Sequence, residues 1–304
     1  MKKVSLSFIV LLIAIFSELG LRFVGIGNFP IYQIDPQIGY IPAPHQSGKF
    51  LQKNKWAFND KSMGVAERFQ GSEKLDLLVI GDSLVYGGNP YRQDEKLGPQ
   101  LQKKLGSSYQ VWPVGAPSWG FLNEKEYLER HPEVIAEIDG MIWVFNSGDF
   151  QDRSQWWTDA THPRAKPICL GYYVLNKYLL EGNLKSTFPA FLFWVKEPAP
   201  FSTKLIDQEI ESFGEKMQEL KANHFKKRLI VFYPNIMEEE LPSNDRYESL
   251  SLRLEERAKA AGALFFDLRK SPHWKGSDYR DGIHPTAEGY ETMAAEVANQ
   301  LGRE

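Results

Sequence analysis

The feature that most constrains the fold is a series of short apolar runs without polar alternation. These runs cover residues 75–80, 109–115, 140–149, 229–234 and 263–269. A strand that is apolar on both faces is expected to be buried on both faces, which is typical of parallel sheets covered by helices. Segments with helical spacing separate the runs. We therefore predict an α/β fold with a parallel five-stranded sheet and helices on both faces.

The helices are predicted from apolar residues that recur every three or four positions. One spans 97–105, another, which we expect to be exposed, spans 122–131, and a charged helix spans 246–261. A last helix carries Tyr290, Met293, Ala294, Val297 and Leu301 on one face. In such a fold the ligand crevice lies beyond the carboxyl ends of the strands. The loops that follow the strands are therefore the place to look for a site.

The N-terminus differs in character from the rest of the chain. A basic start, Met1–Lys3, precedes an almost wholly apolar stretch from Val4 to Phe16. Such a pattern is typical of a secretory signal. No small-residue cleavage motif follows, so we predict that residues 1–27 are a retained signal anchor with one transmembrane helix. The lysines would stay in the cytoplasm and the catalytic domain would lie outside it. A secreted protein with a cleaved signal is the alternative.

The remaining chain divides into an extension and a main domain. Residues 28–74 are rich in turn residues and are predicted to be a linker with a small N-terminal extension. The main domain covers 75–304, with an aromatic-rich insertion at about 150–203. The insertion is interpreted as a lid or substrate platform, with Trp156 and Trp157 as substrate-binding candidates. A separately packed subdomain and a membrane-facing surface at 188–195 are the alternatives.

Composition argues against several classes of function. The net charge is −3 and no basic stripe dominates, so nucleic acid is not an expected partner. Cys169 is the single cysteine, which excludes an intrachain disulfide. The six histidines are scattered without metal-ligand spacing, so no metal site is expected.

The first chemical motif follows the run at 75–80, in the sequence LDLLVIGDSLVYGGNP. Ser83 comes directly after Gly81 and Asp82, where a sharp turn would expose its hydroxyl. A serine hydroxyl is a poor nucleophile unless a base lies nearby, and it also needs donors for the oxyanion. Taken alone, the motif is better explained by a serine that caps the next segment.

The second motif lies near the C-terminus, in YRDGIHPTAEGY. Asp281 and His284 are three residues apart, and a carboxylate near an imidazole fixes its tautomer and supports the imidazolium. Pro285 disfavours a helical conformation at His284, which is therefore expected on a loop before the last helix. Both motifs are thus predicted to lie at the carboxyl edge of the sheet.

Together, GDSL after a buried strand and DGIHP near the C-terminus resemble the GDSL/SGNH hydrolase superfamily. The resemblance covers about 75–300, and the upstream stretch is similar to the lead-in of bacterial membrane-anchored members. It implies a flavodoxin-like three-layer α/β/α sandwich that hydrolyses esters or thioesters, often acetyl groups on carbohydrates. It implies no metal or organic cofactor.

The resemblance also implies roles for individual residues. Ser83 would be the nucleophile, His284 the general base and Asp281 its orienting carboxylate, with Asp82 in a supporting role. The backbone N–H groups of Ser83 and Gly115 would bind the oxyanion.

A third oxyanion donor is normally an asparagine in a Gly-x-Asn-Asp block. Here the chain reads Asn146-Ser147-Gly148-Asp149, so the asparagine and glycine have exchanged places. Asn146 is the candidate for this donor, and Asp149 is a second supporting residue.

The main hypothesis is therefore a membrane-anchored serine esterase that acts on ester groups of a carbohydrate or cell-envelope polymer. An O-acyltransferase with the same triad is the first alternative, because only the acceptor of the acyl group differs. A non-catalytic glycan-binding or assembly protein that keeps the fold is the second alternative.

Overall fold

The computed structural model describes residues 5–151, 153–156, 158–177, 203–240 and 245–302. Trp157 and the stretch 188–195, both singled out from the sequence, lie outside the described residues.

The centre of the molecule is a parallel sheet. Its strands are β5 (Leu75–Gly81), β6 (Tyr109–Gly115), β7 (Gly140–Asn146), β8 (Lys227–Tyr233) and β9 (Leu264–Asp267). The five strands lie in the order β6-β5-β7-β8-β9, and every neighbouring pair is parallel. This is the strand order of a flavodoxin-like sheet. The predicted α/β class and five-stranded parallel sheet are confirmed.

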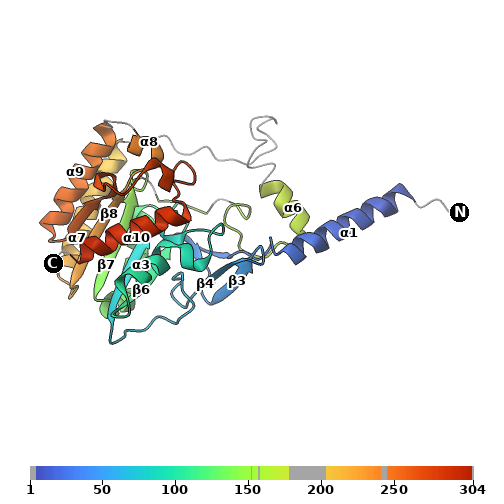
Figure 1. The fold of residues 1–304 in the computed structure, drawn as a ribbon, viewed down its shortest axis with the longest axis horizontal. Coiled ribbons are helices and arrows are strands. Elements are labelled where there is room, and N and C mark those ends of the chain that lie inside the picture. Colours follow the sequence, from blue (N-terminus) through green and yellow to red (C-terminus); the bar gives the residue numbers. More distant parts are fainter. Residues whose placement is uncertain (1–4, 152, 157, 178–202, 241–244, 303–304) are drawn as a thin grey trace.

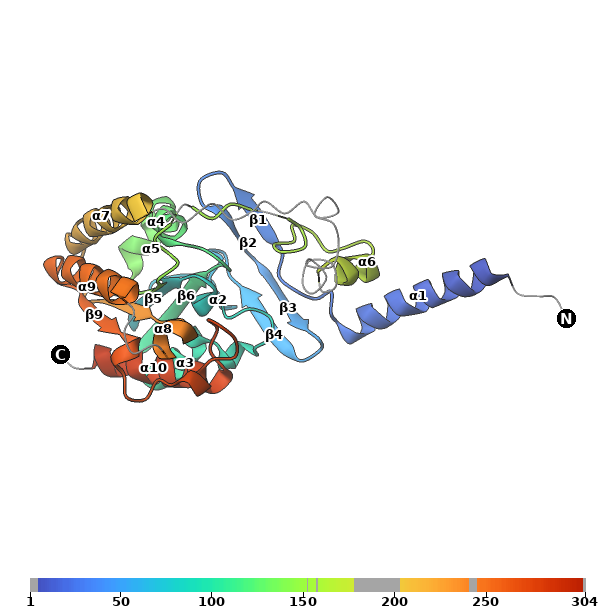
Figure 2. The ribbon, with the colours of Figure 1, turned by 90° about the horizontal axis from the view of Figure 1, so that it is seen from above.

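Helices cover both faces of the sheet (Figures 1 and 2). One face is covered by α3 (Leu97–Leu105) and α10 (Ala287–Leu301). The other is covered by α4 (Phe121–Arg130), α5 (Pro132–Glu137), α7 (Thr203–Lys221) and α9 (Asp245–Ala260). Two apolar cores result, one on each side of the sheet. The strands are buried on both faces, as their unbroken apolar runs predict.

Helix α4 differs from the sequence expectation, which placed it at the surface. Phe121, Tyr127 and Leu128 are buried against the sheet, and so are the polar side chains of Asn123 and Glu124. Both polar residues have partners inside the protein, which removes the usual reason for their exposure. The polar composition of this segment therefore led to the wrong prediction that the helix is exposed, although one of its faces is buried.

The segment 28–74, expected as a linker and small extension, forms two antiparallel hairpins. The first pairs β1 (Tyr32–Asp35) with β2 (Gly39–Pro42), and the second pairs β3 (Gln46–Phe50) with β4 (Asn54–Phe58). Their aromatic side chains join the same apolar core as α4 and α7. The hairpins thus pack on the main domain (Figure 2).

The N-terminal helix α1 (Leu6–Val24) projects away from the rest of the molecule (Figure 1). It is 19 residues long, and none of its residues is buried. By length and composition it is able to cross a membrane. The helix fits either a signal anchor or a signal peptide.

Asn123 connects α4, the first hairpin and the insertion. Its Nδ2 donates to the carbonyl oxygens of Ile38 and Ser154, while its Oδ1 accepts from the backbone N–H groups of Gly120 and Ser154. Asn123→Ala is therefore expected to lower the free energy of unfolding by roughly 2–4 kcal/mol, because unpaired buried polar groups cost roughly 1–3 kcal/mol each. Urea denaturation measures the loss.

Glu129→Ala, on the exposed side of α4, is the matched control. Glu129 pairs with the partly exposed Lys125 and, at 3.8 Å, with the buried Lys216, which keeps Glu219 as its nearer partner at 2.8 Å. The loss of these pairs should therefore cost less than about 1 kcal/mol. An Asn123→Ala loss no larger than that of the control would contradict the proposed connection.

Candidate active site

Ser83 begins a single helical turn at the end of the central strand. Helix α2 (Ser83–Tyr86) follows β5 directly, and the Asp82 side chain caps it by accepting the Leu84 N–H at 2.8 Å. Gly87 then ends the turn with a φ of 74°, a left-handed conformation that glycine adopts without strain. The motif thus combines a helix cap with a serine held at the carboxyl edge of the sheet.

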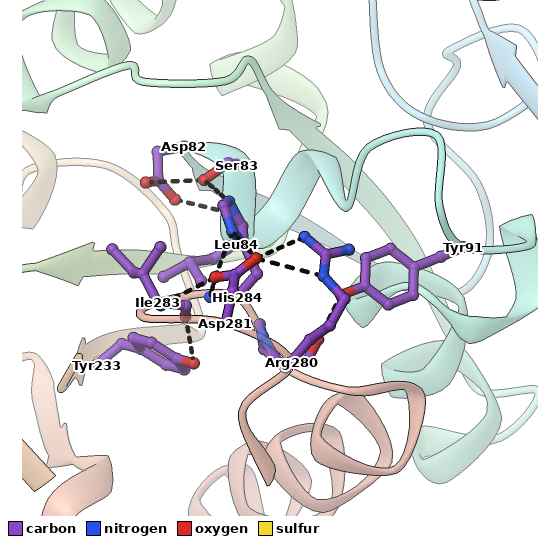
Figure 3. Close-up of polar contacts among 10 residues, drawn as sticks. Asp82, Ser83, Leu84, Tyr91, Tyr233, Arg280, Asp281, Ile283 and His284 are labelled. Carbon is purple, nitrogen blue, oxygen red and sulfur yellow. Dashed lines mark hydrogen bonds and ion pairs between the residues drawn. The ribbon is translucent and has the colours of Figure 1, made fainter. Parts of the chain in front are cut away.

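His284 and Asp281 meet Ser83 across about two hundred residues of sequence (Figure 3). Nε2 of His284 lies 3.0 Å from Oγ of Ser83. Nδ1 of His284 lies 2.9 and 3.0 Å from the two carboxylate oxygens of Asp281. A proton on Nδ1 satisfies the carboxylate and leaves Nε2 as an acceptor for the Ser83 hydroxyl.

Three hydrogen bonds hold the loop that carries His284, two from tyrosine hydroxyls and one from a backbone N–H. Tyr233 donates its hydroxyl to the Ile283 carbonyl at 2.7 Å, and Tyr91 donates to the Pro285 carbonyl. The backbone N–H of Arg280 donates to the His284 carbonyl at 2.8 Å. Sequence reasoning missed Tyr91 and Tyr233. They lie in distant segments, and nothing in the sequence pairs a tyrosine with a particular carbonyl.

The Asp281 carboxylate is stabilised in its ionised form. Partial burial alone raises the pKa of Asp281, but hydrogen bonds from the His284 and Ile283 N–H groups and from the Arg280 side chain outweigh burial. The pKa of Asp281 is therefore held below its ordinary range. This residue stays negatively charged next to His284 throughout the physiological pH range.

Asn146 ends the neighbouring strand β7, and its side chain is fully engaged within the protein. Its Nδ2 group donates to Asp82 Oδ2 at 3.1 Å and to Asp149 Oδ1 at 2.9 Å. Its Oδ1 accepts the Gly148 N–H at 2.7 Å. An amide nitrogen carries only two protons, so both donors of Asn146 face carboxylates in this arrangement.

Gly115 ends β6 directly opposite Gly81 in the parallel ladder. A side chain here would collide with the backbone, because a Cβ at Gly115 would lie 2.3 Å from the Gly81 carbonyl oxygen. The close approach brings the end of β6 beside the start of α2. The three strand ends that carry Gly115, Ser83 and Asn146 are therefore neighbours in the sheet.

A buried acidic cluster lies beneath Ser83, formed by Asp82, Glu124 and Asp149. Burial is the main cause that raises the pKa of Asp82, to about 6. Burial and the neighbouring carboxylates raise the pKa of Glu124 and of Asp149 well above their ordinary ranges. Trp143 donates its indole N–H to Glu124. Such a cluster keeps part of its protons at neutral pH.

A cavity of about 260 Å³ lies beside the helical turn of Ser83. It is lined by Phe29, Pro30, Tyr32, Phe50, Tyr86, Gly88, Asn89, Pro90, Pro117, Thr161, Pro163 and Lys177. Pro117 follows Gly115 closely in sequence, and Tyr86 belongs to α2. Phe29, Pro30, Tyr32 and Phe50 belong to the extension, so residues 28–74 help to shape this cavity.

Trp156, a substrate-binding candidate from the sequence, is not among the residues that line this cavity. Its indole N–H donates to the His162 carbonyl at 2.9 Å, and the Arg164 guanidinium lies 4.1 Å from its ring centroid. One face of the ring is thus already covered. Within the described residues, no group of three or more His, Cys, Asp and Glu side chains is arranged to hold a metal ion.

No family model and no curated protein sequence matches this chain. Solved structures that are similar include a carbohydrate acetylesterase from Sinorhizobium meliloti, with 15% identity and a TM-score of 0.48 over 75% of this chain and 98% of that one. An aryl esterase from M. smegmatis has 16% identity and a TM-score of 0.45 over 74% and 97%. An acetyl xylan esterase has 13% identity and a TM-score of 0.46 over 74% and 99%. Likenesses at this level do not decide the activity of this chain.

The acidic cluster makes stability depend on pH. Above about 4.3, the ordinary pKa of glutamate, the unfolded chain ionises while the folded chain keeps a proton on Glu124, so stability falls by up to about 1.4 kcal/mol per pH unit. Glu124→Gln replaces the titratable carboxyl group with an amide that does not ionise. The variant is therefore expected to gain stability relative to wild type between pH 5 and pH 8, as measured by urea unfolding.

Glu129→Gln, at an exposed position on the same helix, is the control and should follow the wild-type pH dependence. A stability difference between Glu124→Gln and wild type that stays constant over this range would show that Glu124 is ionised in the folded protein.

Proposed function

We propose that this protein is a serine ester hydrolase that works through an acyl-enzyme intermediate. The observation that carries the proposal is the continuous hydrogen-bonded chain from Ser83 through His284 to Asp281. This chain supplies a nucleophile, a base and a group that orients the base, which together activate a hydroxyl at neutral pH. No cofactor enters the proposed reaction.

The reaction begins when Ser83 Oγ attacks the ester carbonyl carbon and its proton moves to His284 Nε2. The ionised Asp281 stabilises the imidazolium that forms. His284 then gives the proton to the leaving alcohol oxygen as the ester C–O bond breaks, which leaves the acyl group on Ser83. A water molecule, deprotonated by His284, releases the acid and restores the serine.

The oxyanion is assigned to two backbone donors, the N–H groups of Ser83 and Gly115. The ends of β5 and β6 lie side by side, which supports placing both donors around one carbonyl oxygen. Asn146 is assigned to a different task, because its two amide protons already face Asp82 and Asp149. It holds the loop after β7 against the nucleophile turn.

The proposed substrate class is an acylated carbohydrate or cell-envelope polymer, as the resemblance to the GDSL/SGNH superfamily implies. The cavity beside α2, with its aromatic and proline walls, suits an apolar acyl group or the face of a sugar ring. A membrane location through α1 belongs to the same proposal, with the catalytic domain outside the cytoplasm.

A non-catalytic glycan-binding protein is the second candidate. The observation that favours it is Gly148, which stands where the resembled family has its asparagine donor. An assay of ester hydrolysis, combined with a glycan-binding measurement, separates the two candidates. A binding protein would bind a glycan without hydrolysing esters.

Ser83→Ala and His284→Ala are each expected to lower kcat for a short-chain aryl ester at least about 10³-fold, because each removes a member of one catalytic unit. The full chain is assayed in detergent micelles, and ester hydrolysis is followed by release of the aryl alcohol. Mass spectrometry of a rapidly quenched reaction should find the acyl group on Ser83.

Ser107→Ala, at an exposed position after α3, is the matched control and should keep wild-type activity. Unchanged hydrolysis in either the Ser83 or the His284 variant would refute the triad. A wild-type protein that does not hydrolyse the ester but binds a glycan would favour the second candidate, a glycan-binding protein.

Asn146→Ala tests the assignment of the third donor. Loss of a true oxyanion donor typically lowers kcat by about 10²–10³-fold. We expect a smaller decrease of kcat together with a lower urea midpoint, because two buried carboxylates lose a hydrogen-bond donor. A decrease of 100-fold or more with an unchanged midpoint would instead assign Asn146 to the oxyanion.

A further inference from the structure

The C-terminal half of α1 is fastened to the insertion by a set of polar contacts. The Glu18 carboxylate accepts the N–H groups of Leu170 and Gly171 at 2.9 and 2.8 Å. Arg22 lies 2.6 Å from Glu18 and donates to the Ile168 carbonyl at 2.7 Å. The helix α6 (Leu170–Val174) therefore lies against α1 (Figures 1 and 2).

The attached stretch of the insertion carries no charge over ten residues, 167–176, between Lys166 and Lys177. Its apolar side chains are exposed, with 97% of Ile168, 66% of Tyr172 and 44% of Leu175 accessible. These three residues, with Leu19 (56%) and Phe23 (83%) of α1, are called the apolar collar. An exposed apolar patch of this kind marks a surface that is covered by a partner or a membrane.

The turn of the second hairpin lies at the same end of α1. Gln52 donates to the Phe23 carbonyl at 3.1 Å, which ties the turn to the end of the helix. Lys49, Lys53 and Lys55 on this hairpin are exposed, and Lys49 lies opposite Lys55 in the ladder. No described residue forms an ion pair with any of the three. Like charges placed opposite each other are unfavourable, and an anionic surface would relieve them.

The length of α1 places these features relative to a bilayer. A helix of 19 residues is about 28 Å long, close to the roughly 30 Å hydrocarbon core. If α1 spans this core, Glu18 and Arg22 enter its outer part together with α6. Polar groups at that depth must have partners within the protein, and the contacts of Glu18 and Arg22 meet this requirement.

We propose that the segment 167–175 is a second membrane contact, which enters the outer leaflet beside α1 while the three hairpin lysines bind anionic headgroups. The inference rests on the proposed membrane location. The occupant of the apolar collar is the lipid bilayer. As a consequence, the catalytic domain is held at a fixed distance from the membrane. The cavity lined by Phe29 and Pro163 then lies close to the membrane surface.

Cys169 provides the test, because it is the single cysteine, is exposed and lies between Ile168 and Leu170. The full chain is labelled there with an environment-sensitive fluorophore and reconstituted in phosphatidylcholine–phosphatidylglycerol vesicles. Spin-labelled lipids with the nitroxide at a shallow acyl position should quench the label at least about twofold. The label should also be protected from aqueous iodide.

Glu256→Cys in a Cys169→Ser background is the matched control, since Glu256 is exposed on α9. Its label should be quenched by iodide and not by the lipids. A Cys169 label that the lipids do not quench, in protein that floats with the vesicles, would overturn the proposal. Protection from iodide without lipid quenching would indicate a protein partner instead and would also overturn it.

Two further measurements on the same samples separate this proposal from those on which it depends. Failure of the full chain to float with vesicles would refute α1 as an anchor and the collar with it. Ester hydrolysis by the same vesicles is independent of where the Cys169 label lies. An inactive sample with a quenched label would refute only the enzymatic proposal.

Discussion

The parallel pairing of β5 between β6 and β7 is the constraint on which the site depends. It brings the carboxyl ends of three strands together, so Ser83, Gly115 and Asn146 meet at one edge. The approach of β6 to β5 is close enough that Gly115 has no room for a side chain. The position of Ser83 is therefore set by the backbone hydrogen bonds of buried strands.

Charge around Ser83 is divided between two environments. Asp281 lies in a loop where N–H groups and Arg280 keep it ionised. Asp82, Glu124 and Asp149 lie in the interior, where burial favours their protonated forms. Acidic side chains thus provide a fixed negative charge on one side of Ser83, and on the other side a buried cluster whose pKa values are raised by burial.

The parts outside the sheet connect the candidate site to the N-terminal helix. The hairpins of residues 28–74 share the core of the main domain and also line the cavity beside α2. The insertion reaches back to α1 through Glu18 and Arg22. The described parts of the extension and the insertion therefore connect α1 with the surroundings of α2, which begins at Ser83.

The sequence by itself determined the sheet and the two motifs that carry Ser83, Asp281 and His284. Unbroken apolar runs identify buried strands, and short motifs such as GDSL and DGIHP keep their spacing in any fold. Only the tertiary structure decided the partners of Asn146, the burial of Glu124 and the support from Tyr91 and Tyr233. These depend on contacts between segments far apart in the chain, and local pattern carries no information about which distant atom a polar group will meet.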